Sequence, residues 1–420
     1  MTKKKIYPWV VVGLLWGVAL LNYMDRQMLS VMKPAMQADI VELRSAANFG
    51  YLMAIFLWVY GFMSPVSGII ADRLNRKWLI VISLFVWSGV TVAMSFATTF
   101  NQLYWLRGVM GLSEALYIPA GLSLIADFHS SKTRSLAIGT HMTGFYFGQA
   151  LGGFGATAAA AFSWQKTFQT FGMAGVIYSL VLILLLRDKK RPADPVSAAL
   201  TNGRKASVLK GLGVLAVNRS FWVILFYFAV SSLPGWATKN WLPTLFAQSL
   251  NIPMAQAGPL STITIAASSF TGVLFGGLLS DRWSQQNAGG RVFTSAIGLF
   301  FTVPALLMLG FGHTLFTIVS GGVFFGLGFG MFDANNMPIL CQFVPVKSRA
   351  TAYGLMNMTG VFFGAFITDV LGNSSDAGNL GKDFAMLAVV VLIAIAALLY
   401  FLRPVTHDFD GPVSDSGGNK

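Results

Sequence analysis

One short pattern occurs twice in this 420-residue chain, with about half the chain length between its copies. Gly-x-x-x-Asp-Arg spans residues 68–73 and again residues 277–282, each time at the end of a long apolar stretch. A second pattern, Phe-x-x-x-Lys-x-Arg, spans residues 128–134 and 343–349. A chain that repeats itself at this interval within a membrane is built from two related bundles, which is the architecture of a rocking transporter.

The composition indicates an integral membrane protein. Hydrophobic residues make up 55% of the chain and charged residues only 11%, with a mean hydropathy of +0.64. Apolar runs recur along the chain, each long enough to cross about 30 Å of hydrocarbon. The expected spans are residues 8–31, 46–70, 78–98, 103–127, 135–161, 167–186, 219–248, 256–279, 292–312, 315–343, 350–371 and 384–402. The alternating pattern of a membrane barrel is absent from the sequence. The prediction is an all-α integral membrane fold of twelve transmembrane helices in two pseudo-symmetric six-helix bundles.

Four segments follow from these spans. Residues 1–186 form the N-terminal six-helix bundle and residues 218–403 the C-terminal one. Residues 187–217, which mix proline, charge and small residues, are expected to be a cytoplasmic linker. Residues 404–420, rich in glycine, serine and aspartate, are expected to be a disordered cytoplasmic tail.

The net charge of +13 reports membrane orientation. With the N-terminus in the cytoplasm, 22 of the 29 Lys and Arg residues lie on the cytoplasmic side. The outer loops carry only Lys33, Arg44, Lys166 and Lys382. This asymmetry is the positive-inside pattern, so both termini are expected in the cytoplasm. The basic residues are expected to contact anionic membrane lipid, and no nucleic-acid partner is expected.

The sequence offers little for enzyme chemistry. A lone cysteine, Cys341, and four scattered histidines argue against a disulfide or a Cys/His metal site. No phosphate-binding loop, dinucleotide fingerprint or zinc-protease motif occurs in the sequence. We therefore expect no enzyme and no cofactor, with protons as the coupling ion.

Charged residues inside the predicted spans are the strongest candidates for function. An ionised side chain at the bilayer centre costs about 2.5–3.5 kcal/mol on insertion scales, so each one needs a reason. Asp25 and Arg26 lie in the first span, and Arg107 and Glu114 lie two turns apart in the fourth. Two acids near two bases can exchange partners as protons and an anion come and go. We assign Asp25 and Glu114 to proton coupling, and Arg26 and Arg107 to substrate binding. A permanent salt-bridge network between the two helices is the structural alternative.

Further candidates lie on other spans. Tyr23 and Tyr146 could shape the binding site, although aromatic residues at such depths often serve packing alone. Lys239, on the seventh span, could contact substrate or extend to the membrane interface. Asn357, on the eleventh, is a potential hydrogen-bond partner for a polar ligand. These four are taken as candidate substrate-binding residues.

The doubled loop motifs predict a cytoplasmic gate. Their acidic and basic side chains stand where the chain leaves the membrane, so contacts among them could close the inner end of the transporter. The expected gate residues are Asp72, Arg73, Arg76, Asp281 and Arg282.

The doubled Gly-x-x-x-Asp-Arg pattern resembles the loop signatures of the major facilitator superfamily. Residues 21–27 (Leu-Asn-Tyr-Met-Asp-Arg-Gln) and 106–115 (Leu-Arg-Gly-Val-Met-Gly-Leu-Ser-Glu-Ala), with Pro119 beyond them, resemble its anion:cation symporters, which include hexuronate, aldonate and sialic-acid carriers. The resemblance implies the major facilitator fold, acids at Asp25 and Glu114 that carry protons, and arginines at Arg26 and Arg107 that hold a carboxylate. It also implies a monomer. Spinster-like lipid transporters share a similar pattern of charges.

These observations lead to an expected function. We expect a secondary active transporter that moves a small organic anion, such as a sugar acid, together with protons by alternating access. The expected location is a bacterial inner membrane. A spinster-like lysolipid or drug exporter of the same superfamily is the nearest alternative. A non-transporting membrane receptor is an alternative of a different class, and a membrane-embedded enzyme is less favoured than either.

Overall fold

The computed structural model describes residues 3–188, 212–345 and 348–402. Within these ranges the chain is helical and contains no strand. Most of the expected linker and all of the expected tail lie outside the described residues, so those two assignments stay predictions.

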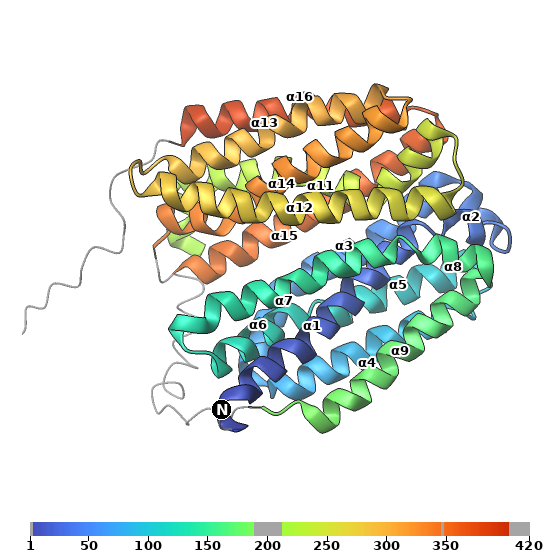
Figure 1. Cartoon of the computed structure of the whole chain (residues 1–420), viewed down its shortest axis with the longest axis horizontal. Helices are drawn as coiled ribbons and strands as arrows, with labels where there is room; N and C mark the ends of the chain where they lie inside the picture. Colours follow the sequence, from blue (N-terminus) through green and yellow to red (C-terminus); the bar gives the residue numbers. More distant parts are fainter. Residues whose placement is uncertain (1–2, 189–211, 346–347, 403–420) are drawn as a thin grey trace, which may run out of the picture.

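The helices pack as two groups, one from each half of the chain (Figure 1). The first group contains α1 (Lys3–Ser30), α3 (Ala46–Arg73), α4 (Arg76–Met94), α5 (Phe100–Glu114), α6 (Tyr117–Phe128), α7 (Ser131–Gly152), α8 (Gly155–Ala161) and α9 (Trp164–Leu185), with the short α2 (Lys33–Met36) and η1 (Val41–Arg44). The second contains α11 (Arg219–Leu250), α12 (Met254–Ser284), α13 (Gly290–Phe311), α14 (Leu315–Phe343), α15 (Arg349–Asp376) and α16 (Leu380–Phe401). Polar side chains cap several of the helices, including Ser45 before α3 and Thr99 before α5.

Eleven helical segments of the described chain are long and apolar enough to cross a membrane, α5 and α6 counting together as one. The fifth expected span is the exception, because it forms α7 followed by α8. With 22 residues, α7 is about 33 Å long and could cross a bilayer. Its polar residues lower its hydropathy, and they include His141 and Gln149, both buried inside the protein. With this span the described ranges contain the twelve membrane-crossing helices of the predicted fold.

Two expected spans are interrupted where the sequence gives a reason. The fourth span breaks directly after Glu114, between α5 and α6. Pro119 lies four residues after Ala115. A proline has no N–H to donate to the carbonyl four residues before it, and its ring clashes with that carbonyl. The fifth span breaks between α7 and α8, next to Gly153. The first of these breaks places Glu114 at the end of a helix in the interior of the protein.

Small residues let helices approach closely. A side chain at Gly148 of α7 would meet the carbonyl oxygen of Leu20 in α1. Across the two groups, a side chain at Gly372 of α15 would lie 2.7 Å from the carbonyl oxygen of Ala46 in α3. Both helix pairs therefore depend on the absence of a side chain at these positions.

The two groups are joined at the end of the molecule where α1 finishes, called the Ser30 end below. Asp376, the last residue of α15, accepts hydrogen bonds from the first turn of α3. Its carboxylate lies 2.6 Å from the backbone nitrogen of Ala46, 2.9 Å from that of Ala47 and 2.7 Å from the hydroxyl of Ser45. A carboxylate at a helix N-terminus satisfies free N–H groups and opposes the helix dipole. Asp376 thus connects the second half of the chain to the first.

A second contact between the groups lies at the same end. Thr262 of α12 donates a hydrogen bond to the carbonyl oxygen of Ala150 in α7, at 3.1 Å. Thr157 of α8 donates to the carbonyl oxygen of Ala255 in α12, at 2.7 Å. Both halves are therefore bound to each other by backbone-directed contacts at the Ser30 end.

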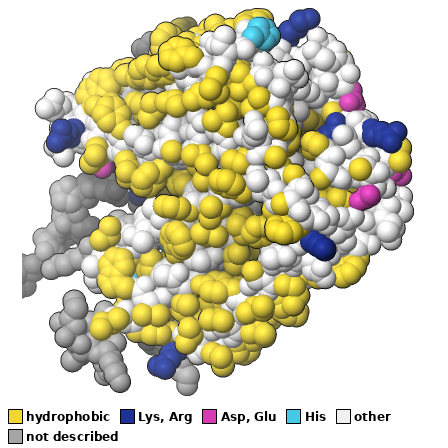
Figure 2. Space-filling model, turned by 45° about the vertical axis from the view of Figure 1, so that its right-hand side comes forward, with side chains coloured by type: hydrophobic (Ala, Val, Ile, Leu, Met, Phe, Trp, Pro, Cys, Tyr) yellow, Lys and Arg dark blue, Asp and Glu magenta, His cyan; other side chains and the backbone are white. Residues whose placement is uncertain are grey.

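The surface is consistent with a lipid environment. Hydrophobic side chains cover much of the face in Figure 2, and the charged side chains visible there lie mainly toward its edges. Large apolar side chains such as Phe275, Phe316 and Leu184 are well exposed. In water such a surface would drive aggregation, whereas lipid accommodates it. The protein is an integral membrane protein.

We predict that Asp376→Ala weakens the closure of the Ser30 end. Hydrogen bonds to a charged group contribute about 1.5–3 kcal/mol, so the population open at this end should rise roughly tenfold or more. Spin labels at the exposed residues Glu42 and Lys382, in a Cys341→Ser background, would report this as a shift to longer distances. Asp369→Ala, on the same helix, is the control. Identical distance distributions in both variants would contradict the prediction.

We also predict that Gly148→Ala destabilises the contact between α1 and α7 by about 1–3 kcal/mol, which is typical of overpacking. Gly139→Ala is the matched control, because the same helix leaves open space within 4 Å of that position. Thermal unfolding in detergent should show a lower midpoint for Gly148→Ala only. Equal midpoints would mean that α1 shifts to accept the methyl group.

Candidate functional site

A cluster of four charged side chains lies in the interior of the first helix group. Asp25 and Arg26 come from α1, and Arg107 and Glu114 come from α5. Glu114 is 0% exposed, Arg107 3% and Asp25 6%. The two acids and two bases balance in formal charge. This balance matters because an isolated buried ion would cost several kcal/mol.

Glu114 is the centre of the cluster. Its Oε2 atom accepts a hydrogen bond from Nε of Arg26 at 2.7 Å and another from the side-chain amide of Asn22 at 3.0 Å. Arg26 and Asn22 are four residues apart on α1, so both face the same side of that helix. The ion pair therefore joins the first span to the end of α5, next to the break in the fourth span.

Asp25 and Arg107 occupy the neighbouring positions. Asp25 accepts a hydrogen bond from Thr91 of α4, at 3.4 Å, and points away from Arg26 as expected for adjacent helical residues. Its charge interacts with those of Arg107 and Glu114. One guanidinium nitrogen of Arg107 lies 2.9 Å from the sulfur of Met110. The sulfur is only a weak acceptor, so Arg107 keeps most of its capacity to bind an anion.

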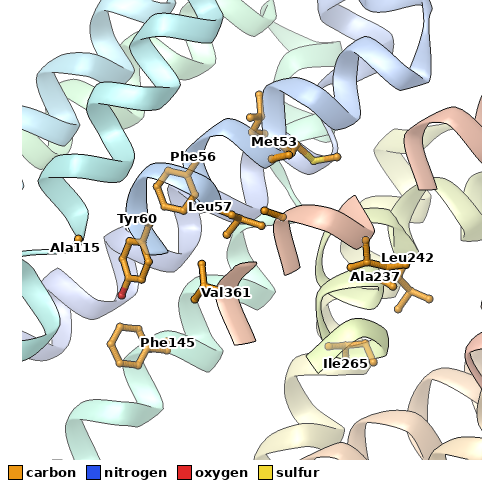
Figure 3. Close-up of a cluster of buried hydrophobic side chains, with 14 of the residues drawn as sticks. Met53, Phe56, Leu57, Tyr60, Ala115, Phe145, Ala237, Leu242, Ile265 and Val361 are labelled. Atoms are coloured by element: carbon orange, nitrogen blue, oxygen red, sulfur yellow. The ribbon is translucent and has the colours of Figure 1, made fainter. Parts of the chain in front are cut away.

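Aromatic rings enclose the two arginines. The guanidinium carbon of Arg26 lies 4.8 Å from the ring centre of Phe56 and 4.7 Å from that of Tyr60, and Arg107 lies 4.5 Å from Phe56. Figure 3 shows Phe56 and Tyr60 on one helix, with Phe145 opposite Tyr60. Cation–π contacts of this kind stabilise a buried cation without neutralising its charge. The rings thus hold both guanidinium groups in place without supplying a counter-charge.

Several polar atoms of the cluster remain unsatisfied. Among the described residues, Oε1 of Glu114, Nη2 of Arg26 and Nε of Arg107 are buried and have no hydrogen-bond partner. A buried polar atom left without a partner costs about 1–3 kcal/mol, and more when it belongs to a charged group. A proton on Glu114 or an anion near the arginines would relieve part of this cost.

A pocket with a cavity volume of about 80 Å³ lies beside the cluster, between the two helix groups. The candidates Tyr23, Tyr146 and Lys239 line it, together with Met142, Phe145, Gln149, Gly235, Thr238, Ile265, Ser269, Phe325, Phe329, Gly330 and Asp333. Tyr23 connects the pocket to the cluster, because its ring centre lies 5.3 Å from the guanidinium carbon of Arg26. The pocket therefore has the mixed apolar and polar lining of a small-molecule site.

Asn357 lies elsewhere. Its side-chain amide donates a hydrogen bond to the hydroxyl of Ser64 at 3.0 Å, which ties α15 to α3. The structure thus places this candidate between the two helix groups, and its role in substrate binding stays a prediction.

The described gate residues make contacts within their own half of the chain. Arg76 pairs with Asp127, which ties α4 to α6, and Asp281 lies 3.8 Å from Arg291 of α13. Arg282 is exposed. The side chains of Asp72 and Arg73 lie outside the described part of the structure. The gate assignment stays a prediction.

Sequence reasoning did not include Asn22, Phe56 or Tyr60 in the site. Asn22 could have been found, because a lone amide four residues before Arg26 in an apolar span would face the same side. Phe56 and Tyr60 could not, because nothing in their pattern distinguishes rings that contact arginines from rings that contact lipid.

Comparisons with known proteins give the family. Residues 15–368 match the family model of the Major Facilitator Superfamily. The chain belongs to this superfamily of transporters. It is 25% identical to the hexuronate transporter of Escherichia coli strain K12, over 96% of each chain. It is 28% identical to protein spinster homolog 1 of Xenopus laevis, over 90% of this chain and 75% of that protein.

A solved structure supports the same fold. The crystal structure of a bacterial homolog of the human lysosomal transporter Spinster, in an inward-facing and unoccupied conformation, superimposes with a TM-score of 0.79. The two chains are 19% identical, and the match covers 96% of this chain and 98% of the other. The predicted twelve-helix fold of this superfamily is therefore confirmed, and the protein is a transporter rather than an enzyme.

We predict that Arg26 and Glu114 act as a coupled pair in stability. Removing one partner of a buried ion pair typically costs about 3–5 kcal/mol, because the other charge is left buried and alone. Arg26→Gln and Glu114→Gln should each lower the unfolding midpoint in detergent, and the double variant should lose clearly less than the sum of the two. Losses that simply add would show that the two side chains do not interact.

Proposed function

We propose that the protein is a secondary active transporter that carries a small organic anion together with protons by alternating access. The proposal rests on the buried ion pair of Glu114 and Arg26. In this pair the carboxylate of Glu114 occupies a guanidinium group that could otherwise bind the carboxylate of a substrate. The relatives include a hexuronate carrier, which is consistent with an anionic substrate. Membrane lipid surrounds the protein, and the functional unit is a monomer.

The exchange of partners at Glu114 couples the two cargoes. While Glu114 is ionised, it satisfies Arg26 and competes with any anion for this guanidinium. A proton on Glu114 removes that competition, and Arg26 then offers its donors to a carboxylate in the pocket, where Tyr23 lies between the two sites. Asp25 interacts electrostatically with Arg107 without a hydrogen bond between them, and we propose it as a second proton site. The loaded protein carries less net buried charge than one with either cargo alone, so it changes conformation at lower cost.

The contacts at the Ser30 end suggest which state this is. With the N-terminus in the cytoplasm, the Ser30 end faces outward, and the contacts of Asp376 and Thr262 close that side. The protein then faces inward, which is consistent with Arg76 and Asp281 forming, among the described residues, ion pairs within their own halves. We place it in a bacterial inner membrane with both termini in the cytoplasm.

A spinster-like exporter of lysolipids or drugs is the second candidate. It is favoured by the apolar rings of Phe145, Phe325 and Phe329 in the pocket, which could contact a hydrocarbon chain. Such cargo would move without stimulation by an inward proton gradient. The uptake experiment below distinguishes the two.

We predict that an acidic exterior stimulates uptake of labelled sugar acids into proteoliposomes, and that Glu114→Gln abolishes this stimulation. Glutamine imitates the protonated acid and cannot release a proton. Counterflow exchange of substrate, which requires no net proton movement, should persist in Glu114→Gln. Gradient-driven uptake at the wild-type rate in this variant would disprove the assignment of Glu114.

Arg107→Ala should weaken substrate binding by roughly tenfold to a hundredfold, because a charged hydrogen bond contributes about 1.5–3 kcal/mol. Equilibrium binding to protein in detergent measures this without any gradient. Arg291→Ala, which removes an arginine far from the pocket, is the control. Wild-type affinity in Arg107→Ala would exclude this residue from the substrate site.

A further inference from the structure

The pocket contains a second pair of opposite charges that the mechanism above does not use. Lys239 of α11 and Asp333 of α14 both line it, on the side formed by the second half of the chain. Their charges interact, yet within the described residues they form no ion pair at 4.0 Å or less. Two opposite charges that face one pocket without forming an ion pair both remain able to interact with a ligand.

Lys239 is held by aromatic rings rather than by an acid. Its ammonium nitrogen lies 4.8 Å from the ring centre of Trp236 and 5.9 Å from that of Tyr23. Its backbone carbonyl accepts a hydrogen bond from Gln27 of α1 at 3.1 Å, which fixes this part of α11 against the first half. The ammonium group is therefore positioned toward the pocket, and no described ion pair neutralises its positive charge.

Asp333 is accessible although it lies in the middle of a membrane-length helix. One of its oxygens accepts a hydrogen bond from the amide of Asn336 at 3.3 Å. No described residue donates a hydrogen bond to the other oxygen, Oδ2. Because the side chain is exposed to the pocket, this oxygen can accept a hydrogen bond from a ligand and will repel a second anion.

The walls between the two charges are largely apolar. Phe325 and Phe329 stack with their ring centres 5.6 Å apart, and both line the pocket with Phe145. Gln149 and Ser269 add a few neutral polar groups. Such a lining accommodates a carbon skeleton with polar groups at its ends, and leaves discrimination to the charged residues.

We propose that Lys239 and Asp333 form a specificity subsite that favours an organic monoanion with a hydrogen-bond donor over a dianion. The proposal deepens the proposed function and rests on it for the claim that this pocket binds substrate. Lys239 attracts the anionic ligand, and Asp333 accepts a hydrogen bond from a hydroxyl group at its far end. A second carboxylate at that end would instead meet the carboxylate of Asp333.

D-gluconate and D-glucarate test this directly, because they share one carbon skeleton and differ at one end. Gluconate carries a hydroxyl group there, and glucarate a second carboxylate. In calorimetric titrations of the purified protein at fixed pH, gluconate should bind at least about tenfold more tightly than glucarate, since like charges in one site disfavour each other. Asp333→Asn should reduce this ratio by roughly tenfold, mainly by strengthening glucarate binding. Lys239→Gln should weaken both ligands.

Two further variants serve as controls. Asp333→Glu retains the charge and should retain the preference for gluconate. Asp369→Asn makes the same change on α15, at a residue outside the pocket lining, and should alter neither affinity. Equal binding of the two ligands by the wild type, the same ratio in Asp333→Asn as in the wild type, or binding of neither would overturn the proposal.

The outcome can be separated from that of proton coupling. An unchanged ratio in Asp333→Asn together with lost gradient-driven uptake in Glu114→Gln would reject the subsite and support the transport mechanism. A changed ratio with normal proton-driven uptake in Glu114→Gln would support the subsite and reject the mechanism.

Discussion

The buried ion pair between Arg26 and Glu114 is the interaction on which the site depends. Glu114 is fully enclosed, and its carboxylate could not remain ionised there without Arg26 and the amide of Asn22. A buried pair of this kind adds little to stability when compared with apolar packing of the same shape. The pair matters for function because Arg26 can form a low-energy contact either with Glu114 or with a bound anion. The break between α5 and α6 places the acid where this exchange can occur.

The rest of the molecule arranges two halves around this pair. Glycines such as Gly148 in the first half and Gly298 in the second let the helices approach closely, so each half moves as a packed unit. Contacts between the halves combine the hydrogen bonds of Asp376 to the start of α3 with apolar packing of α15 against α3, including Phe362 against Trp58 and Phe62. The pocket lies between the halves, where a change in their relative position alters its access.

The sequence allowed much of this to be predicted. The doubled motif and the recurring apolar runs predicted the twelve helices. The free-energy cost of placing a charge in lipid pointed to the four charged residues that the structure brings together, Asp25, Arg26, Arg107 and Glu114. A threshold on mean hydropathy alone would not identify the fifth span as a membrane helix, because His141, Gln149 and the first turn of α7 make it polar. Contacts across the halves could not be predicted, since Asn357 meeting Ser64 and Asp376 meeting Ala46 depend on how two separately encoded bundles meet. The open pair of Lys239 and Asp333 lies within the second half, and its geometry depends on how α11 and α14 pack around the pocket.

The central claim is that substrate replaces Glu114 at Arg26 while Glu114 accepts a proton. Infrared difference spectroscopy of the purified protein on addition of substrate measures this step directly. The account predicts a new carbonyl stretch of a protonated carboxyl group. This band should be reduced in Glu114→Gln, where only Asp25 can still accept a proton, and unchanged in the control Glu42→Gln, which changes an exposed acid at the Ser30 end. A spectrum without that band in the wild type, or with the same band in Glu114→Gln, would contradict the account.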